Sequence, residues 1–417
     1  MPDFSFKPHE LMAPVLVCSM LLPATALGLT LAEAEQRAIS HNPALTASEA
    51  AADAADGDAR QAGLPANPEV GFSRENMGND RLTGLDGPAS TWQLSQKLDL
   101  TGQRGARRAS ALGEAEAARS RLLRERELLR ADVRSTWVDV VAAQQRVTFA
   151  DELGRVTTST RDAVAAQVKA GKVSPIELTR VEVAAAALQR RAQIVRLSLG
   201  AARQRLANLQ GLASPDFGAL PDVVPEALPL PTEDDVRQRV PSSLWVHEAE
   251  ARTKASEASL RAAKAARLSG VTVSVGQTQF ERAGESAWQM GVSVPLPLFD
   301  RNQGAVQAAE ARVRQARAQT ETTSQGLRTE LEVLYPQVRT LEQQLNTFRQ
   351  SVLPASEEAF SAVNKGYRFG KFGLLDVLDA QRALIDTRFD YLDTLTEYHR
   401  QRNRLYALLG LTQESPL

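Results

Sequence analysis

The chain repeats itself once, and this internal repeat limits its possible folds more strongly than any other feature of its 417 residues. Three landmarks recur with an offset of 199 residues: the glycine–lysine joints Gly171-Lys172 and Gly370-Lys371, the pairs Gly211-Leu212 and Gly410-Leu411, and the glycines Gly105 and Gly304. A repeat at one fixed period means that one structural unit is used again. The mature chain is therefore predicted to be a tandem duplication of a unit of about 200 residues.

A proline-rich segment at 212–231 separates the two units, which span 27–211 and 232–417. Proline fixes φ and cannot donate a backbone hydrogen bond, so this segment is predicted to be an extended linker. Each unit opens with a hydroxyl residue followed three positions later by a carboxylate, which is the pattern of a helix-capping box. The pairs are Thr30 with Glu33 and Thr232 with Asp235.

Long helices are predicted to make up most of each unit. A first helix precedes the strands and two long helices follow them, at about 31–63, 103–152 and 155–210 in the first unit and at about 232–268, 302–351 and 355–410 in the second. Apolar residues spaced by seven, such as Leu378, Ile385 and Leu392, indicate helices packed side by side. Aromatic residues make up only 5% of the chain, which argues against an ordinary globular core.

Two short strands are predicted in each unit, at about 67–78 and 90–100 and at about 270–282 and 286–298. Apolar residues alternate there with small or polar ones, although Gln96 interrupts the apolar face. This alternation is typical of an outer-membrane strand with one face toward lipid and one toward water. The residues predicted to face lipid are Trp92, Leu94, Val271, Val273, Val275, Trp288, Met290, Val292 and Val294.

Four strands are too few to close a barrel, and an open sheet edge cannot lie in lipid. Several copies must then pool their strands, and three chains would form a twelve-stranded barrel. The predicted fold class is mainly α with a small β part, in which tandem long helical hairpins form a periplasmic α-barrel. The alternative is a soluble helical rod that carries a small sheet.

The first 26 residues are predicted to be a cleaved signal peptide. An apolar run at Leu11–Leu22 precedes Ala24-Thr25-Ala26, which has the small-x-small form of a cleavage site. The run is shorter than the ~20 residues that a spanning helix needs. Val17 precedes Cys18, where a lipoprotein signal needs a small residue, so lipidation of Cys18 is not expected.

Composition and motifs argue against several functions. The formal net charge is -1, which creates no field that would gather nucleic acid. The one cysteine and four scattered histidines do not form a metal-ligand pattern, and His399 is expected to be packed or to face a lumen. The sequence also lacks a nucleophile elbow and a phosphate-binding loop. We therefore predict neither an enzyme nor a protein with a cofactor.

Three motifs carry a resemblance to a known family. They are Asn67-Pro68-Glu69-Val70, the stretch from Val294 to Gly304 with Pro-Leu-Phe-Asp-Arg-Asn-Gln-Gly at its end, and the two glycine–lysine joints. The chain resembles the TolC-type outer-membrane factors over essentially its whole mature length. It is most similar to the outer-membrane components of cobalt–zinc–cadmium type heavy-metal efflux pumps.

The resemblance implies an architecture and a set of partners. A homotrimer would form a twelve-stranded barrel in outer-membrane lipid and a twelve-helix tunnel in the periplasm. The linker and the chain ends would form an equatorial belt. The tunnel tip would meet a periplasmic adaptor (membrane fusion protein), which joins it to an inner-membrane RND proton antiporter. The chain itself would conduct substrate passively, without energy-coupling machinery.

The turns between the long helices are the remaining candidates for function. The predicted turns, Leu153-Gly154-Arg155 and Val352-Leu353-Pro354-Ala355, would form the periplasmic tip and dock the adaptor. Glu357 and Glu358 follow the second turn and could form a gate that attracts cations. The alternative is that these carboxylates only stabilise a helix N-terminus.

The sequence alone is compatible with three functions. The first is a passive exit duct for heavy-metal cations. The second is a duct of the same kind for drugs or for type I protein secretion. The third is an exported coiled-coil scaffold or adhesin without a pore.

Overall fold

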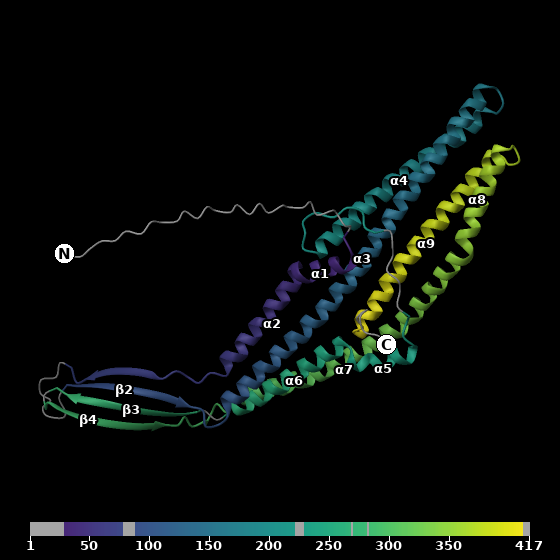
Figure 1. Ribbon diagram of the computed structural model, residues 1–417. Helices are drawn as coiled ribbons and strands as arrows, with labels where there is room; N and C mark the ends of the chain where they lie inside the picture. Colours follow the sequence, from purple (N-terminus) through teal and green to yellow (C-terminus); the bar gives the residue numbers. More distant parts are fainter. Residues whose placement is uncertain (1–28, 78–87, 222–228, 268–269, 282, 412–417) are drawn as a thin grey trace, which may run out of the picture.

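The computed structural model describes residues 29–77, 88–221, 229–267, 270–281 and 283–411. The molecule is elongated, with a β-sheet at one end and the free ends of two helical hairpins at the other (Figure 1). The predicted signal peptide lies outside the described residues.

The described residues form one antiparallel sheet of four strands in the order β1-β2-β3-β4. The strands are β1 (Glu69–Glu75), β2 (Ala89–Leu98), β3 (Val271–Phe280) and β4 (Glu285–Ser293). They begin and end within five residues of the predicted bounds, and the largest difference is at the end of β4. The central pair joins the two repeats, because β2 belongs to the first unit and β3 to the second.

The first unit contains α1 (Leu31–His41), α2 (Pro43–Ala62), α3 (Gln103–Lys169) and α4 (Pro175–Leu209). The first helix is broken at Asn42, whose side-chain oxygen caps α2 and whose amide nitrogen donates to the carbonyl of Leu209 at 2.9 Å. The side chain thus fastens the bend between α1 and α2 to the end of α4. The capping box of Thr30 and Glu33 is present.

The second unit repeats this plan with more interruptions. It contains α5 (Glu233–Arg239), the short η2 (Val240–Ser242), α6 (Leu244–Ala265), α7 (Gln303–Thr347), the π-helical η3 (Phe348–Val352), α8 (Leu353–Arg368) and α9 (Leu374–Leu409). The capping box of Thr232 and Asp235 is also present.

The predicted turn at 153–155 is wrong, because α3 runs through it without a break for 67 residues. Leu153 is buried in a cluster with Phe149 from α3 and Phe389 from α9. A glycine inside a helix costs only about 1 kcal/mol, which such packing outweighs. Gly154 therefore does not end the helix.

The predicted turn at 352–355 is wrong as well. Pro354 lies in the first turn of α8, directly after the π-helical η3. A proline inside a regular helix loses one hydrogen bond and clashes with a preceding carbonyl, and a wider π-turn can relieve that clash. The helix therefore passes the proline with a local irregularity.

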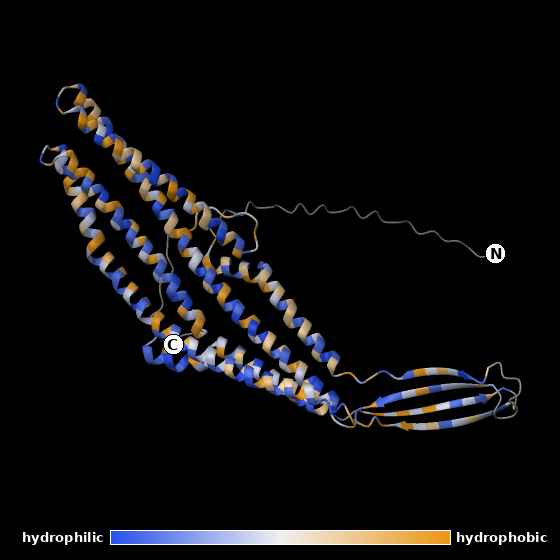
Figure 2. Cartoon of the chain, turned by 180° about the vertical axis from the view of Figure 1, so that it is seen from behind, coloured by the Kyte–Doolittle hydropathy of each residue, from blue (hydrophilic) through white to orange (hydrophobic). Residues whose placement is uncertain are grey.

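The described residues contain no helix that is both long and apolar enough to cross a membrane. In Figure 2, apolar and polar residues are interleaved along the helices and alternate along the strands. Apolar burial is instead distributed over several clusters along the helical body.

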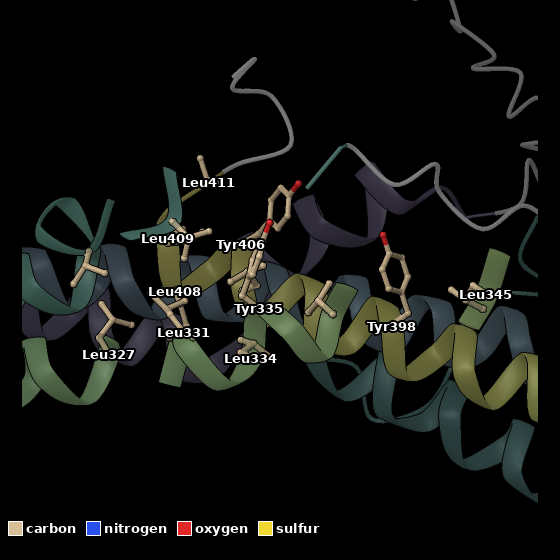
Figure 3. Close-up of a cluster of buried hydrophobic side chains, with 14 of the residues drawn as sticks. Leu327, Leu331, Leu334, Tyr335, Leu345, Tyr398, Tyr406, Leu408, Leu409 and Leu411 are labelled. Carbon is tan, nitrogen blue, oxygen red and sulfur yellow. The ribbon is translucent and has the colours of Figure 1, made fainter. Parts of the chain in front are cut away.

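The largest cluster lies where α7 packs on α9, near the middle of the molecule (Figure 3). Tyr335 and Tyr406 belong to it, and their hydroxyls donate to the carbonyls of Pro231 and Pro229, each at 3.0 Å. The described parts of the linker, 212–221 and 229–231, contain no helix or strand. These hydrogen bonds hold the end of the linker against the body.

Gly113 marks a close approach between the repeats within the helical body. A Cβ atom there would lie 2.8 Å from the Cα of Ala255, so α3 and α6 are in backbone contact. We predict that Gly113→Ala destabilises the protein by about 1–3 kcal/mol through overpacking. Gly105→Ala is the matched control in the same helix, because its Cβ would meet no described atom within 4 Å. Thermal unfolding compares the two, and equal midpoints would contradict the close contact.

Candidate functional site: the sheet, the hairpin tips and the helical wall

One face of the sheet is apolar across all four strands. The register aligns Val70, Leu94, Val275 and Met290 in one row, and Val273 lies beside Val292 in the next. Met290 is 87% exposed, and Trp288 and Val292 are exposed as well. The β3 valines are half-buried because they have neighbours on both sides. Among the described residues, nothing in one copy of the chain covers this face.

Aromatic rings gather in the next row of this face towards the β1–β2 and β3–β4 connections. Phe72 pairs with Trp92, with ring centroids 4.8 Å apart, and Trp288 lies in the same row. Beyond this row the same face turns polar, because Arg74 and Ser90 both bind the carboxylate of Glu281. An apolar band that ends in aromatic and then charged residues is typical of a membrane interface.

The predicted lipid-facing residues within the strands all lie on this face, and Val294, just after β4, is exposed. Their contact with lipid stays a prediction. Gln96 interrupts the face, as predicted, and its amide nitrogen donates to the carbonyl of Ala66 at 2.8 Å. This contact lies at the helical end of the sheet and places the polar group beside backbone.

The opposite face of the sheet is small and polar. One row contains Gly71, Gln93, Gly276 and Gln289, and in the next the hydroxyls of Thr91 and Thr278 lie 2.9 Å apart. A Cβ atom on Gly276 would lie 2.8 Å from the carbonyl oxygen of Trp92, so glycine is needed there. The sheet therefore separates an apolar side from a water-compatible side.

The chain reverses at the two glycine–lysine joints, which are the real hairpin tips. Gly171 and Gly370 both have a φ of +71°, the left-handed region that glycine favours. At each tip the next residue, Lys172 or Lys371, donates its backbone N–H to the carbonyl five residues before it, at 2.9 Å. Both tips are therefore Schellman-type helix ends with the same geometry.

The new helix after each tip is capped in its own way. The hydroxyl of Ser174 accepts from the backbone N–H of Ile176, whereas the backbone N–H of Gly373 donates to the carboxylate of Asp376 at 2.8 Å. Phe369 is 80% exposed at the second tip. Phe372 instead covers Gly366, so only part of this tip is free to meet a partner.

The structure places the predicted tip residues well inside the helices. About 17 residues separate Gly154 from Gly171, which is roughly 25 Å along a helix. Leu153 is buried and Leu353 is half-buried, whereas Arg155, Val352, Pro354 and Ala355 are exposed. The repeated Gly-Lys motif was the sequence signal for the true tips, because each glycine follows a helix and precedes a new helix start.

The predicted gate carboxylates also lie inside a helix. Glu357 accepts from the guanidinium of Arg388, with the Nη2 atom 2.6 Å away, and this ion pair joins α8 to α9. Glu358 is exposed on α8. A gate role for these two residues stays a prediction, although Glu357 already has a cationic partner.

A hollow of about 820 Å³ lies on the helical wall. In this wall α3 packs against α2 on one side and α6 on the other, and α6 packs against α7. All four helices line the hollow. A hollow shared by four adjacent helices marks the concave side of a curved layer.

His399 is a buried histidine of α9 that lies edge-on to Tyr398. Burial lowers the pKa of its imidazole to about 4, and the charges of Arg402 and Arg349 act in the same direction. Within the described residues, no group of three His, Cys, Asp or Glu side chains is arranged to hold a metal ion. His399 is thus a neutral packing residue at physiological pH.

This architecture is similar to that of known proteins. The solved structure of the transmembrane channel CusC superposes with a TM-score of 0.75 at 20% identity, covering 93% of each chain. The two chains therefore share one fold. A family model described as outer membrane efflux protein matches residues 34–212 and 241–411.

Two characterised relatives carry metal-resistance names. The cobalt-zinc-cadmium resistance protein CzcC of Cupriavidus metallidurans is 32% identical over 395 residues, covering 94% of this chain and 92% of the relative. The nickel-cobalt-cadmium resistance protein NccC of Alcaligenes xylosoxydans xylosoxydans is 27% identical over 323 residues, covering 74% and 71%.

The chain belongs to the outer membrane efflux protein family. It is an efflux channel protein of the Gram-negative outer membrane, homologous to heavy-metal resistance factors, and its family is not enzymatic. The predicted resemblance and fold class are confirmed. The family assignment decides against a scaffold or adhesin without a pore.

The buried imidazole predicts a pH dependence of stability. In the unfolded chain a histidine titrates near 6.5, so the unfolded state binds more protons than the folded state between pH 6.5 and about 4. Stability is therefore full above pH 6.5 and is lost as the pH falls through this window, by at most roughly 3 kcal/mol. His399→Gln should flatten this dependence in thermal unfolding followed from pH 7 to pH 4.5. An unchanged slope would contradict the assignment.

Proposed function

We propose that three copies of this chain form a passive exit duct that conducts heavy-metal cations from a periplasmic pump to the exterior. The observation that carries the proposal is the two-faced sheet with open edges. One face is apolar and uncovered, the other is small and polar, and β1 and β4 each pair with only one strand among the described residues. Such a sheet is complete only in lipid and only with further strands.

The open edges favour closure by identical copies. An unpaired backbone group in hydrocarbon costs several kcal/mol, so β4 of one copy would pair with β1 of the next. Three copies would then supply twelve strands. From Trp92 to Leu100 the apolar face covers nine residues, which is roughly 27 Å of extended chain. At the usual strand tilt this projects to about 20 Å, close to the height of an outer-membrane apolar band.

The helical hairpins also have open sides. Within one chain the seam between the repeats joins α3 to α9, for example through Arg146 and Asp393 at 2.6 Å and through Gln381 and Thr157 at 2.6 Å. By the internal duplication, α7 and α8 of one copy would meet α4 of the next in the same way. Exposed apolar residues on the outer side of α4 support this contact; they are Val183, Ile194 and Leu197.

The proposal that metal ions are the cargo rests on the names of the relatives and on the polar residues of the inner surface. CzcC and NccC are named for resistance to cobalt, cadmium and zinc or nickel. A duct for ions needs a water-compatible lining that does not hold them tightly. The polar sheet face, with its glycine, serine, threonine and glutamine side chains, provides such a lining.

The hairpin tips are the proposed contact with a periplasmic adaptor, which would link the duct to an inner-membrane RND proton antiporter. The two tips present exposed Phe369, Ile176 and Leu375 together with the exposed Lys172 and Lys371. Aromatic and aliphatic anchors with a charged rim are typical of specific protein interfaces. Because the tips repeat twice in each chain, a trimer would offer six docking positions.

Deletion of this protein should make the host sensitive to a small set of metal ions, with zinc, cobalt and cadmium tested first. Growth is measured across these ions and across nickel, copper and silver, with dyes and antibiotics as controls. A complementing copy of the gene should restore resistance. Sensitivity to drugs alone would support a drug duct and would contradict the proposed cargo.

Substitution at the tip should weaken adaptor binding, whereas substitution at the predicted turn should not. Phe369→Ser removes an exposed ring and is expected to lower affinity for the adaptor of the same system by roughly tenfold or more. Gly154→Arg is the comparison, since it lies roughly 25 Å away along the hairpin. Surface plasmon resonance with the purified adaptor measures both. If Gly154→Arg weakens binding and Phe369→Ser does not, the adaptor docks at residues 153–155 and the proposed docking at the tips is wrong.

A further inference from the structure

The hollow on the helical wall is lined by charged side chains, five of which form one ion-pair network. Four arginines and three glutamates line it among the described residues, namely Arg121, Arg124, Arg252, Arg312, Glu114, Glu125 and Glu248. If three copies close into a tube, as proposed above, the concave side of each wall faces the axis. The network then lies on the lumen surface of the helical part of the tube.

Arg124 lies between two carboxylates. Its Nε atom is 2.5 Å from Glu248, and its Nη2 atom is 3.9 Å from Glu125. The guanidinium also lies over the ring of Trp245, 5.8 Å from its centroid. One cation from α3 thus bridges a carboxylate of its own helix and a carboxylate of α6.

Two further arginines occupy the remaining sides of these carboxylates. Arg121 donates to Glu125 at 2.7 Å, and Arg252 lies 2.6 Å from Glu248. Burial opposes ionisation of Glu125, but hydrogen bonds from Ser48 and Arg121 outweigh it and lower the pKa of the carboxyl. Glu125 is thus ionised, and cations of the protein itself bind it.

The two carboxylates of the network are more buried than Arg121 and Arg252, which bind them. The side chain of Glu248 is 9% exposed and that of Glu125 is 26% exposed, whereas Arg121 and Arg252 are 57% and 58% exposed. An ion in the hollow therefore meets guanidinium groups before it meets these two carboxylates. With Glu114 and Arg312 included, the lining has one more arginine than glutamate per copy.

This arrangement bears on how a duct would treat a divalent cation. Two adjacent carboxylates are a common protein contribution to a divalent-metal site. Without a guanidinium between them, Glu125 and Glu248 would offer such a pair on the lumen surface. Tight binding there would slow the exit of cations, because conduction requires that an ion can leave a site as easily as it enters.

We propose that Arg124, with Arg121 and Arg252, acts as a clamp that withholds Glu125 and Glu248 from passing divalent cations, so that this section of the duct conducts without capturing them. The arginines are selectivity-determining residues of the lumen. The proposal rests on the proposed pore, since it requires the hollow to face the channel axis.

Planar-bilayer recordings of the purified trimer test the clamp with Cd²⁺ as the probe. Arg124→Gln combined with Arg252→Gln should shift the reversal potential in a KCl gradient toward cation selectivity. It should also lower the Cd²⁺ concentration for half-block by about tenfold or more, because two neighbouring positive charges are removed. Adding Glu248→Gln to this variant should restore the wild-type response to Cd²⁺. Arg252→Gln alone removes an exposed side chain and should give a smaller shift in the same direction.

Arg261→Gln is the matched control, since Arg261 is exposed nine residues further along α6, on the opposite side of the helix from Arg252. It should behave as wild type. Channels whose selectivity and Cd²⁺ block are the same in wild type, Arg252→Gln and the double variant would overturn the clamp and leave the pore intact. A wild-type protein that forms no channels would instead overturn the proposed function. A clamp variant that becomes more anion-selective would also contradict the proposal.

Discussion

The seam between the two repeats is the interaction on which the rest of the structure depends. β2 of the first unit pairs with β3 of the second along its whole length, and below the sheet α3 packs against α6 and then against α9. Neither unit could bury its own apolar surface alone, because a two-stranded sheet and a single helical hairpin are marginal in isolation. The 67-residue helix α3 crosses the entire body and touches both units, so it acts as the common support of the chain.

The contacts between the two repeats inside one copy differ from the outer sides of that copy, which lack such contacts. Inside one copy, the described contacts between the repeats include strand pairing, ion pairs such as Arg146 with Asp393, and the rings of Phe149 and Phe389. At the outer sides the same types of element are open: β1 and β4 have one partner each, and α4 shows apolar residues to solvent. The proposed trimer would cover these open sides. Each open element has a counterpart in the other repeat, and that counterpart is already in contact within the chain.

The repeats are not identical, and the differences lie where the second unit needs other geometry. α3 is continuous, whereas its counterpart is divided into α7, η3 and α8, with Pro354 directly after the π-turn. The sequence contained this proline, but a proline alone predicts only that something must change in the backbone. Whether it ends a helix or is absorbed by a π-turn depends on the packing around it. By contrast, both hairpin tips share one Schellman geometry, as their common Gly-Lys motif would suggest.

The sequence by itself determined the duplication, the four strands and their alternating faces, the linker, the capping boxes and the resemblance to the family. Each of these features follows from the types of residue and their spacing along the chain. Only the tertiary structure decided that the helices continue through Gly154 and Pro354, since both residues are tolerated when buried neighbours such as Leu153 hold the helix together. It also decided which charges neighbour which. Arg124 and Glu248 lie 124 residues apart in the chain, and no pattern along the sequence could show that one guanidinium separates two carboxylates. Periodicity records which side of an element is apolar, but contacts between distant elements arise only when the two repeats pack together.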